Sequence, residues 1–221
     1  DMRCYFLNLS SCEPNFEESV NGIFAENVPH IPYTNQTTIL YWLYQYATRP
    51  QTWLRKEVFD YSSKVPLATP CTVIHVRRSD VVLHDDVSRR YHKIREYVNA
   101  IPDPNKKKLK NIFLLTDDQN AVEEALEEYP EYNWIYLDRP RHRGAEGGWE
   151  NQTPSNDPKS EVVIILSILD LVGKCERLVY STSGFADELS RAMGEGAERI
   201  NLDDGLYVRK KFSGTWIVNK K

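Results

Sequence analysis

Residues 72–80 read TVIHVRRSD, a short run rich in β-branched side chains that is followed at once by two arginines. A short apolar run without polar alternation is typical of a strand that is buried on both faces, as in a parallel sheet. We therefore predict a buried strand over residues 72–76, with Arg77 and Arg78 at its carboxyl end.

Similar apolar segments recur along the chain and alternate with segments of helical spacing. Further strands are predicted at residues 111–116 (NIFLLT), 133–137 (NWIYL) and 177–181 (RLVYS), and helices at 90–100, 119–128, 158–172 and 185–193. Two earlier helices are predicted at residues 37–48, which Pro50 closes, and at about 51–61. This alternation favours a doubly wound α/β domain, in which helices cover both faces of a parallel sheet.

Ligands of such domains bind at the carboxyl ends of the strands. The polar residues at these ends are Arg77, Arg78, Asp80, Asp117, Asp118, Asp138, Arg139, Thr182, Ser183 and Gly184. The Ser183-Gly184 turn opens a helix, whose first N–H groups favour an anion. The two arginines have two interpretations. They pair with acids such as Asp80 and Asp117 and hold loops together, or they bind a diphosphate, whose oxygens match the guanidinium fork.

The segment 138–157 is long, lacks a helical or strand pattern, and contains Arg141, Arg143 and Trp149. Long irregular segments inside a compact domain often act as lids or binding loops. We interpret this segment as a binding loop, and a surface insertion without function is the alternative.

The composition bounds the function. The 221 residues are 41% hydrophobic and 27% charged, which is typical of one globular domain, alone or with a small extension. A net charge of −4 argues against nucleic-acid binding, so an anion site has to be local. No apolar run is long enough to span a membrane. The chain starts at Asp1 without a signal peptide, and we expect any membrane anchor to lie in a preceding segment.

Cysteines and glycosylation sequons bear on the compartment. Sequons of the N-x-S/T type begin at Asn8, Asn35 and Asn151. Cys4 and Cys12 are close enough in sequence to bridge a short loop. We expect the secretory-pathway lumen, and the alternative is that the sequons occur by chance and the cysteines are reduced and buried.

The stretch His75-Val76-Arg77-Arg78-Ser79-Asp80 resembles the H-V-R-R-x-D signature of the α1,6-fucosyltransferases and their relatives, which include the nodulation and protein O-fucosyltransferases. Three further segments are similar to that family in the same order: residues 42–57 (WLYQYATRPQTWLRKE), 113–118 (FLLTDD) and 178–193 (LVYSTSGFADELSRAM). The resemblance covers about residues 42–203.

The resemblance implies a Rossmann-like, nucleotide-sugar-binding domain that forms half of a GT-B-type glycosyltransferase, preceded by a helical extension. It divides the chain into an extension at residues 1–68, a GDP-fucose-binding domain at 69–205 and a C-terminal tail with a strand pair at 206–221. The implied reaction is an inverting transfer of fucose from GDP-fucose to a glycan or glycoconjugate hydroxyl, without a metal or other cofactor. The implied location is the Golgi lumen.

The resemblance also implies roles for individual residues. Arg77 corresponds to the phosphate-binding arginine, and His75 to the residue that lies against the guanine. Asp117 and Asp118 correspond to the paired aspartates that activity requires. The remaining substrate-binding residues of these blocks are Arg78, Asp80, Ser183, Gly184 and Phe185.

Two assignments stay open because the sequence departs from the family pattern. Counting from Asp80 puts the general base at Asp85, with Asp86 adjacent and His84 as a further candidate. A carboxylate that recognises guanine is expected on the helix at 158–172, but the aligned residue there is Ile168. Glu161 and Asp170 are the two alternatives.

Three rival functions are considered. A non-catalytic nucleotide-sugar-binding module would keep the arginines without turnover, and Val81, where the family has a lysine, favours it. A divalent metal at Asp117 and Asp118 is disfavoured because the arginines already neutralise the phosphates. A glycosidase acting through Asp117 and Asp85 would leave the arginine pair without a purpose.

Overall fold

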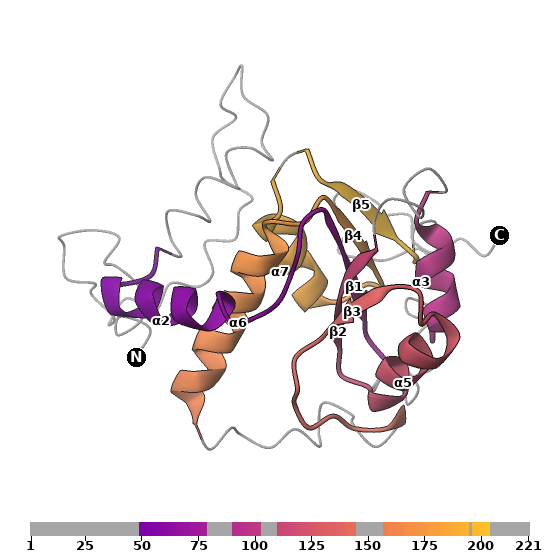
Figure 1. The fold of residues 1–221 in the computed structure, drawn as a ribbon, viewed down its shortest axis with the longest axis horizontal. Coiled ribbons are helices and arrows are strands. Elements are labelled where there is room, and N and C mark those ends of the chain that lie inside the picture. The colour runs from indigo at the N-terminus through magenta and orange to yellow at the C-terminus, as the bar shows by residue number, and fades with distance from the viewer. Residues whose placement is uncertain (1–48, 79–89, 103–109, 145–156, 195, 204–221) are drawn as a thin grey trace, which may run out of the picture. The chain divides into compact units, whose positions relative to one another are not determined.

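The computed structural model of the protein describes residues 49–78, 90–102, 110–144, 157–194 and 196–203 (Figure 1). The chain divides into two compact units, Asp1–Glu57 and Val58–Lys221, and the second contains the sheet and the site described below. Several predicted features lie outside the described residues: the helix at 37–48, the strand pair after residue 205, Cys4, Cys12, the three sequons, Asp80, Val81, His84, Asp85, Asp86 and Trp149.

A five-stranded parallel sheet forms the centre of the second unit (Figure 1). Its strands are β1 (Cys71–Val76), β2 (Asn111–Thr116), β3 (Asn133–Ile135), β4 (Arg177–Tyr180) and β5 (Glu198–Asn201). Their order across the sheet is β3-β2-β1-β4-β5. The chain therefore runs outward from β1 to β3, returns to the other side of β1, and continues to β5. This reversal creates a switch point between β1 and β4, where such sheets bind ligands.

Helices cover both faces of the sheet, which confirms the predicted doubly wound α/β fold (Figure 1). On one face, α3 (Ile94–Ala100) and α5 (Gln119–Glu128) pack against Ile74 and Val76 of β1. On the other face, α6 (Pro158–Val172) and α7 (Gly184–Ala192) pack against Cys71 and Val73. Because side chains alternate along a strand, His75 projects toward the face of α6 and α7.

The helices with strong caps start where the sequence predicts or within one residue. Asp118 caps α5 by accepting a hydrogen bond from Asn120 N, and Asp157 caps α6 by accepting one from Ser160 N. Pro158 at the first helical position needs no N–H partner, which favours the start of α6 there. Ser183 caps α7 in the same manner, through Ala186 N. The remaining helix, α2 (Thr52–Ser62), agrees with the helix predicted at about 51–61.

Several element boundaries and one strand differ from prediction. Strand β1 begins at Cys71, one residue before its predicted start, and α7 ends at Ala192, one residue before its predicted end. The helix predicted at 90–100 begins only at Ile94, because the carbonyl of His92 accepts two hydrogen bonds from Arg78 instead of joining a helix. The strand predicted at 133–137 ends at Ile135, because the carbonyl of Leu137 accepts from Arg141. The strand and helix predicted at 177–181 and 185–193 are off by one residue, with β4 ending at Tyr180 and α7 beginning at Gly184. Strand β5 was missed because its sequence, ERIN, is mostly polar, as suits an edge strand.

A disulfide joins Cys71 at the start of β1 to Cys175, just before β4, across 104 residues of sequence. The sequence predicted no partner for either cysteine. A crosslink that closes a loop of about 100 residues lowers the conformational entropy of the unfolded chain. In the chain-entropy description, this stabilises the folded state by up to about 4.7 kcal/mol. In the described part of the chain, no helix is long and apolar enough to cross a membrane.

Candidate functional site

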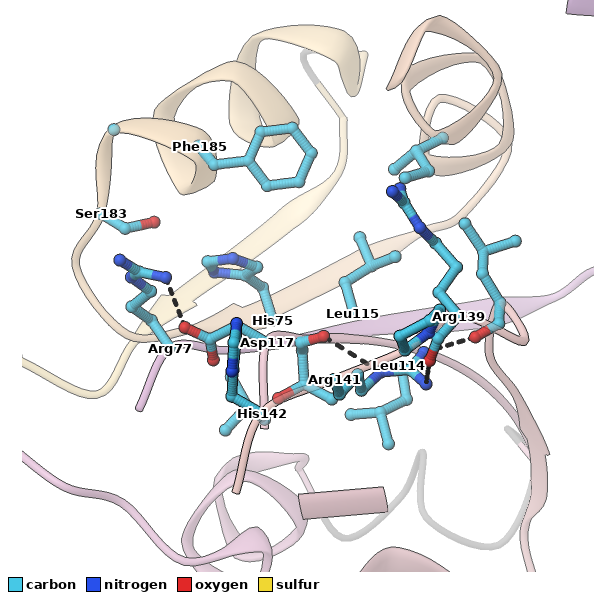
Figure 2. Close-up of a pocket in the computed structure, with 16 residues that line it drawn as sticks. His75, Arg77, Leu114, Leu115, Asp117, Arg139, Arg141, His142, Ser183 and Phe185 are labelled. Carbon is cyan, nitrogen blue, oxygen red and sulfur yellow. Dashed lines mark hydrogen bonds and ion pairs between the residues drawn. The ribbon is translucent and has the colours of Figure 1, made fainter. Parts of the chain in front are cut away.

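A pocket of about 650 Å³ lies at the carboxyl ends of β1, β2 and β4, at the switch point of the sheet (Figure 2). The backbone N–H of Arg77, after β1, donates to the Ser181 hydroxyl, after β4, at 3.3 Å and so joins the two loops there. The pocket is lined by His75, Val76, Arg77, Leu114, Leu115, Thr116, Asp117, Leu137, Arg139, Pro140, Arg141, His142, Ile168, Ser183, Gly184 and Phe185.

Arg77 both lines the pocket and pairs with an acid. Its Nη1 donates to Asp117 Oδ2, and the two side chains are 20% and 23% exposed (Figure 2). Asp117 Oδ1 also accepts from the backbone N–H of Arg78 at 3.1 Å. The two interpretations of Arg77 are thus compatible, because Asp117 holds the guanidinium at the pocket wall without burying it.

Arg78 is fully buried and contacts only protein. Its Nη1 and Nη2 each donate to Glu124 at 2.8 Å, and Nη1 also donates to Asp118 at 3.3 Å. Nε and Nη2 donate to the carbonyl of His92 at 2.9 and 2.8 Å. All five donors of the guanidinium are therefore occupied. Arg78 is thus an internal anchor for the segment after β1 and does not line the pocket, and its contact with substrate stays a prediction.

Asp118 is also fully buried, and its oxygens are occupied. Oδ1 accepts from Asn120 N at 3.0 Å and from Gly144 N at 3.1 Å, while Oδ2 faces Arg78. Gly144 has φ +53°, a backbone conformation that a residue with a side chain rarely adopts. The side chain of Asp118 therefore lies inside the protein, where it holds residues 142–144 against the end of β2, and its role in activity stays a prediction.

His75 and Phe185 form an aromatic wall at the base of the pocket. Their ring centroids lie 5.7 Å apart in an edge-on arrangement (Figure 2). Burial lowers the pKa of His75 to about 4, so the imidazole is neutral at physiological pH. Its Nδ1 is buried and, among the described residues, has no hydrogen-bond partner. A neutral ring with one unused nitrogen suits contact with a planar ligand that offers a polar atom.

Two hydrogen bonds to side chains fix the turn before α7. Thr182 N donates to Asp203 Oδ2 at 2.7 Å, and Ala186 N donates to Ser183 Oγ at 3.0 Å. The α-carbon of Gly184 faces open space, since a methyl group there would meet no atom within 4 Å. Because Ser183, Gly184 and Phe185 line the pocket, the amino end of α7 lies at the pocket wall, and the Ser183-Gly184 turn opens a helix as predicted.

The sequence matches the family model described as alpha-(1,6)-fucosyltransferase N- and catalytic domains over residues 23–143, more than half of the chain. The chain belongs to this fucosyltransferase family. The resemblance seen in the sequence motifs is thereby confirmed.

Solved structures of fucosyltransferases also match. Similarity to POFUT1 in complex with GDP-fucose is 14% in sequence, over 74% of this chain and 50% of that chain, with a TM-score of 0.46. A mutant of Arabidopsis thaliana FUT1 in complex with GDP matches at 16% identity, over 81% of this chain and 38% of that chain, with a TM-score of 0.44. NodZ from Bradyrhizobium matches at 15%, over 66% and 43%, with a TM-score of 0.32. The chain spans half or less of these proteins.

In this fucosyltransferase-family chain, the structure separates the two carboxylates that the sequence left as alternatives. Glu161, in the first turn of α6, accepts from Arg139 Nη2 at 2.7 Å, and Arg139 lines the pocket. Asp170 instead accepts from Lys174 Nζ on the exposed side of α6. Ile168, at the aligned position, does line the pocket. Asp170 therefore lies away from the residues that line the pocket, while Glu161 lies beside one of them, and the assignment of the guanine carboxylate stays a prediction.

The pocket wall also contains residues that were not among the predicted site residues: Arg139, Pro140, Arg141 and His142. They belong to the start of the segment 138–157, which was interpreted as a binding loop. His142 O accepts from Gln119 N at 2.8 Å, and Arg143 pairs with Glu123 at the surface. The backbone bonds of His142 and Gly144, to Gln119 N and Asp118 Oδ1, hold residues 141–144 against the start of α5. The described residues contain no group of three or more potential metal ligands.

A buried histidine makes stability of the fucosyltransferase-family domain depend on pH. His92 Nε2 lies 2.9 Å from Asp203 Oδ1 and Nδ1 lies 3.0 Å from Glu96 Oε2. Burial by itself would lower the pKa of His92, but the bonds to Asp203 and Glu96 outweigh it and raise the pKa. His92 thus contributes stability below its unfolded pKa, near 6.5, and this contribution is lost as pH rises through the folded pKa.

We expect the free energy of unfolding, measured in urea, to fall as pH rises above about 6.5. His92→Gln should remove this alkaline dependence. His75 acts in the opposite direction, because its lowered pKa means that only the unfolded chain takes up a proton between pH 6.5 and about 4. His75→Phe should therefore flatten the acidic side alone. An alkaline slope that persists in His92→Gln would contradict this role of His92.

Proposed function

We propose that this chain is the donor-binding half of a GDP-fucose-dependent fucosyltransferase, which transfers fucose with inversion and without a metal to a glycan or glycoconjugate hydroxyl. Membership of the family supports the reaction class. The observation that carries the proposal is the position of Arg77, whose guanidinium lines the pocket at the switch point near the start of α7. A diphosphate at this point would meet both a cation and a helix amino end.

In the proposed reaction, an acceptor hydroxyl oxygen attacks C1 of fucose from the face opposite the nucleotide. The bond between C1 and the β-phosphate oxygen breaks, and its electron pair leaves with GDP. Negative charge grows on the β-phosphate, where Arg77 and the N–H groups of Gly184 and Phe185 would stabilise it. Such groups are effective because they are oriented before the reaction begins. Asp117 would hold Arg77 in place through their ion pair.

The acceptor hydroxyl loses a proton, and we propose Asp85 or Asp86 as the base. Both residues, together with Asp80, lie outside the described residues, so their assignment rests on the family pattern alone. For the guanine, we propose contact with the His75 and Phe185 rings. The Arg139–Glu161 pair would supply the carboxylate that accepts from the base edge.

We further propose a secretory-pathway location, in the Golgi lumen. The disulfide between Cys71 and Cys175 supports an oxidising compartment, since cytosolic proteins rarely keep such bonds. A fucosyltransferase acting on glycans would meet its acceptors there.

Calorimetric titration with GDP, GDP-fucose, GDP-mannose and UDP tests the donor. We expect GDP and GDP-fucose to bind and UDP to bind at least about tenfold more weakly, because a pyrimidine cannot offer the guanine edge. Equal affinity for UDP would remove the guanine assignment. Release of GDP from GDP-fucose should survive EDTA in the presence of candidate acceptors, whereas its loss would revive a metal at Asp117. Binding without any GDP release would indicate the non-catalytic module.

A further inference from the structure

Three arginines line the pocket, and two of them are paired with carboxylates. Arg77 donates to Asp117, and Arg139 Nη2 donates to Glu161 at 2.7 Å. The charges of these two guanidinium groups are therefore compensated by the protein. The third arginine, Arg141, is bound differently.

Arg141 is held by backbone carbonyl groups. Its Nε donates to Thr116 O at 3.2 Å, its Nη1 to Arg139 O at 3.0 Å, and its Nη2 to Leu137 O (Figure 2). These carbonyls belong to the end of β2 and to the segment after β3, so the guanidinium is fixed in orientation. A guanidinium has five N–H donors, and these bonds occupy three of them.

No carboxylate among the described residues forms an ion pair with Arg141. Asp138 is exposed and acts on it only through space. Burial lowers the pKa of Arg141, and the neighbouring charge of Arg139 adds to this effect. An arginine nevertheless stays protonated in a protein. The pocket wall therefore carries a positive charge that no carboxylate among the described residues neutralises. Part of the free-energy cost of burying this cation remains until an anion binds.

The position of Arg141 complements the other anion-binding groups. In the order β3-β2-β1-β4, Arg141 lies at the ends of β2 and β3, and the Ser183 turn lies at the end of β4. Arg77 follows β1, between them. An anion in the pocket would thus meet positive groups from both sides of the switch point.

We propose that Arg141 binds an anionic oxygen of the ligand, a phosphate oxygen of the nucleoside diphosphate, and supplies the net positive charge of the pocket. This inference rests on the proposed function for the identity of the ligand. The residue would act by direct contact, with the donors that the three carbonyls leave over. The charges of Arg77 and Arg139 are offset by their carboxylate partners, whereas the charge of Arg141 makes the potential of the pocket positive.

The test compares three variants of the full chain, each probed with GDP, guanosine and inorganic pyrophosphate. Arg141→Gln removes the charge, Arg141→Lys keeps it, and Arg143→Gln removes a charge two residues away that is paired with Glu123 outside the pocket wall. Loss of a charge-assisted phosphate contact should weaken GDP binding by about 10- to 100-fold in Arg141→Gln. Guanosine binding should stay unchanged, Arg141→Lys should recover part of the loss, and Arg143→Gln should bind GDP normally.

The salt dependence provides a second readout. The fall in GDP affinity between low and high salt should be shallower in Arg141→Gln than in the unmodified chain, because one phosphate contact fewer is screened. An equal loss for GDP and guanosine would overturn the proposal, since Arg141 would then only hold the pocket wall. If the unmodified chain binds pyrophosphate through Arg141 but prefers no guanine nucleotide, the proposed function fails while the anion site stands.

Discussion

Arg77→Ala weakens GDP binding by about 100-fold and leaves the domain folded, if its guanidinium binds the diphosphate. The substitution removes a cation from the pocket wall and leaves Asp117 facing the phosphates without its partner. Both changes oppose an anionic ligand. Stability should change by less than about 1 kcal/mol, because the pair is partly exposed to solvent. Calorimetry with GDP and thermal unfolding measure the two quantities separately.

Asp117→Asn is the matched control for Arg77→Ala. It breaks the same ion pair but keeps the cation, so GDP affinity should fall much less than in Arg77→Ala. If the pair served only to join the loops after β1 and β2, both variants would lose GDP binding equally. Unchanged affinity in Arg77→Ala would remove the phosphate role and with it the main support for the proposed function.

Arg78→Met is expected to destabilise the domain by about 3–5 kcal/mol. The variant leaves the fully buried Asp118 and the partly buried Glu124 without their cation, and it removes two hydrogen bonds to the His92 carbonyl. Arg78→Lys should destabilise the domain nearly as much, because one ammonium group cannot reach Asp118, Glu124 and the His92 carbonyl at the same time. The free energy of unfolding from urea denaturation measures the effect.

Arg143→Gln serves as the control for Arg78→Met. It also removes an arginine that pairs with a glutamate on α5, but its side chain and that of Glu123 are largely exposed. The expected loss of stability is below about 1 kcal/mol. If Arg78→Met were as mild as Arg143→Gln, the buried network would not anchor the segment after β1.

The sequence was most informative where apolar pattern and capping residues agree. β2, α5 and α6 have the predicted bounds. The two helices each begin directly after an aspartate that caps them, Asp118 and Asp157, so the sequence marks their starts. Residues 90–93 were predicted as helix because their local sequence permits one. The buried guanidinium of Arg78 occupies the His92 carbonyl, and the bond from Ile94 N to Glu124 also fixes the start of α3; both are contacts with distant residues.

Within the site, the sequence correctly located the strand ends but did not separate neighbouring residues. Arg77 and Asp117 reach the pocket, whereas the next residues, Arg78 and Asp118, are buried beneath it. The alternation of side chains along a strand predicts this difference: His75 and Arg77 point to one face of the sheet, and Arg78 points to the other. The motif resemblance treats each pair as a unit and so hides the difference.

The role of Arg141 was not predictable from the sequence, because its partners are backbone carbonyls from two separate segments. No residue pattern encodes such bonds. The sequence indicated only that the segment containing it is long and rich in arginine.

The disulfide between Cys71 and Cys175 lies at the amino ends of β1 and β4, and the pocket lies at their carboxyl ends. A covalent link at one end of two neighbouring strands fixes the distance between them at that end. Any widening between these strands is then confined to the far end, where the backbone of Arg77 meets the Ser181 hydroxyl. The disulfide therefore fixes the separation and the register of β1 and β4 at the end of the sheet opposite the pocket.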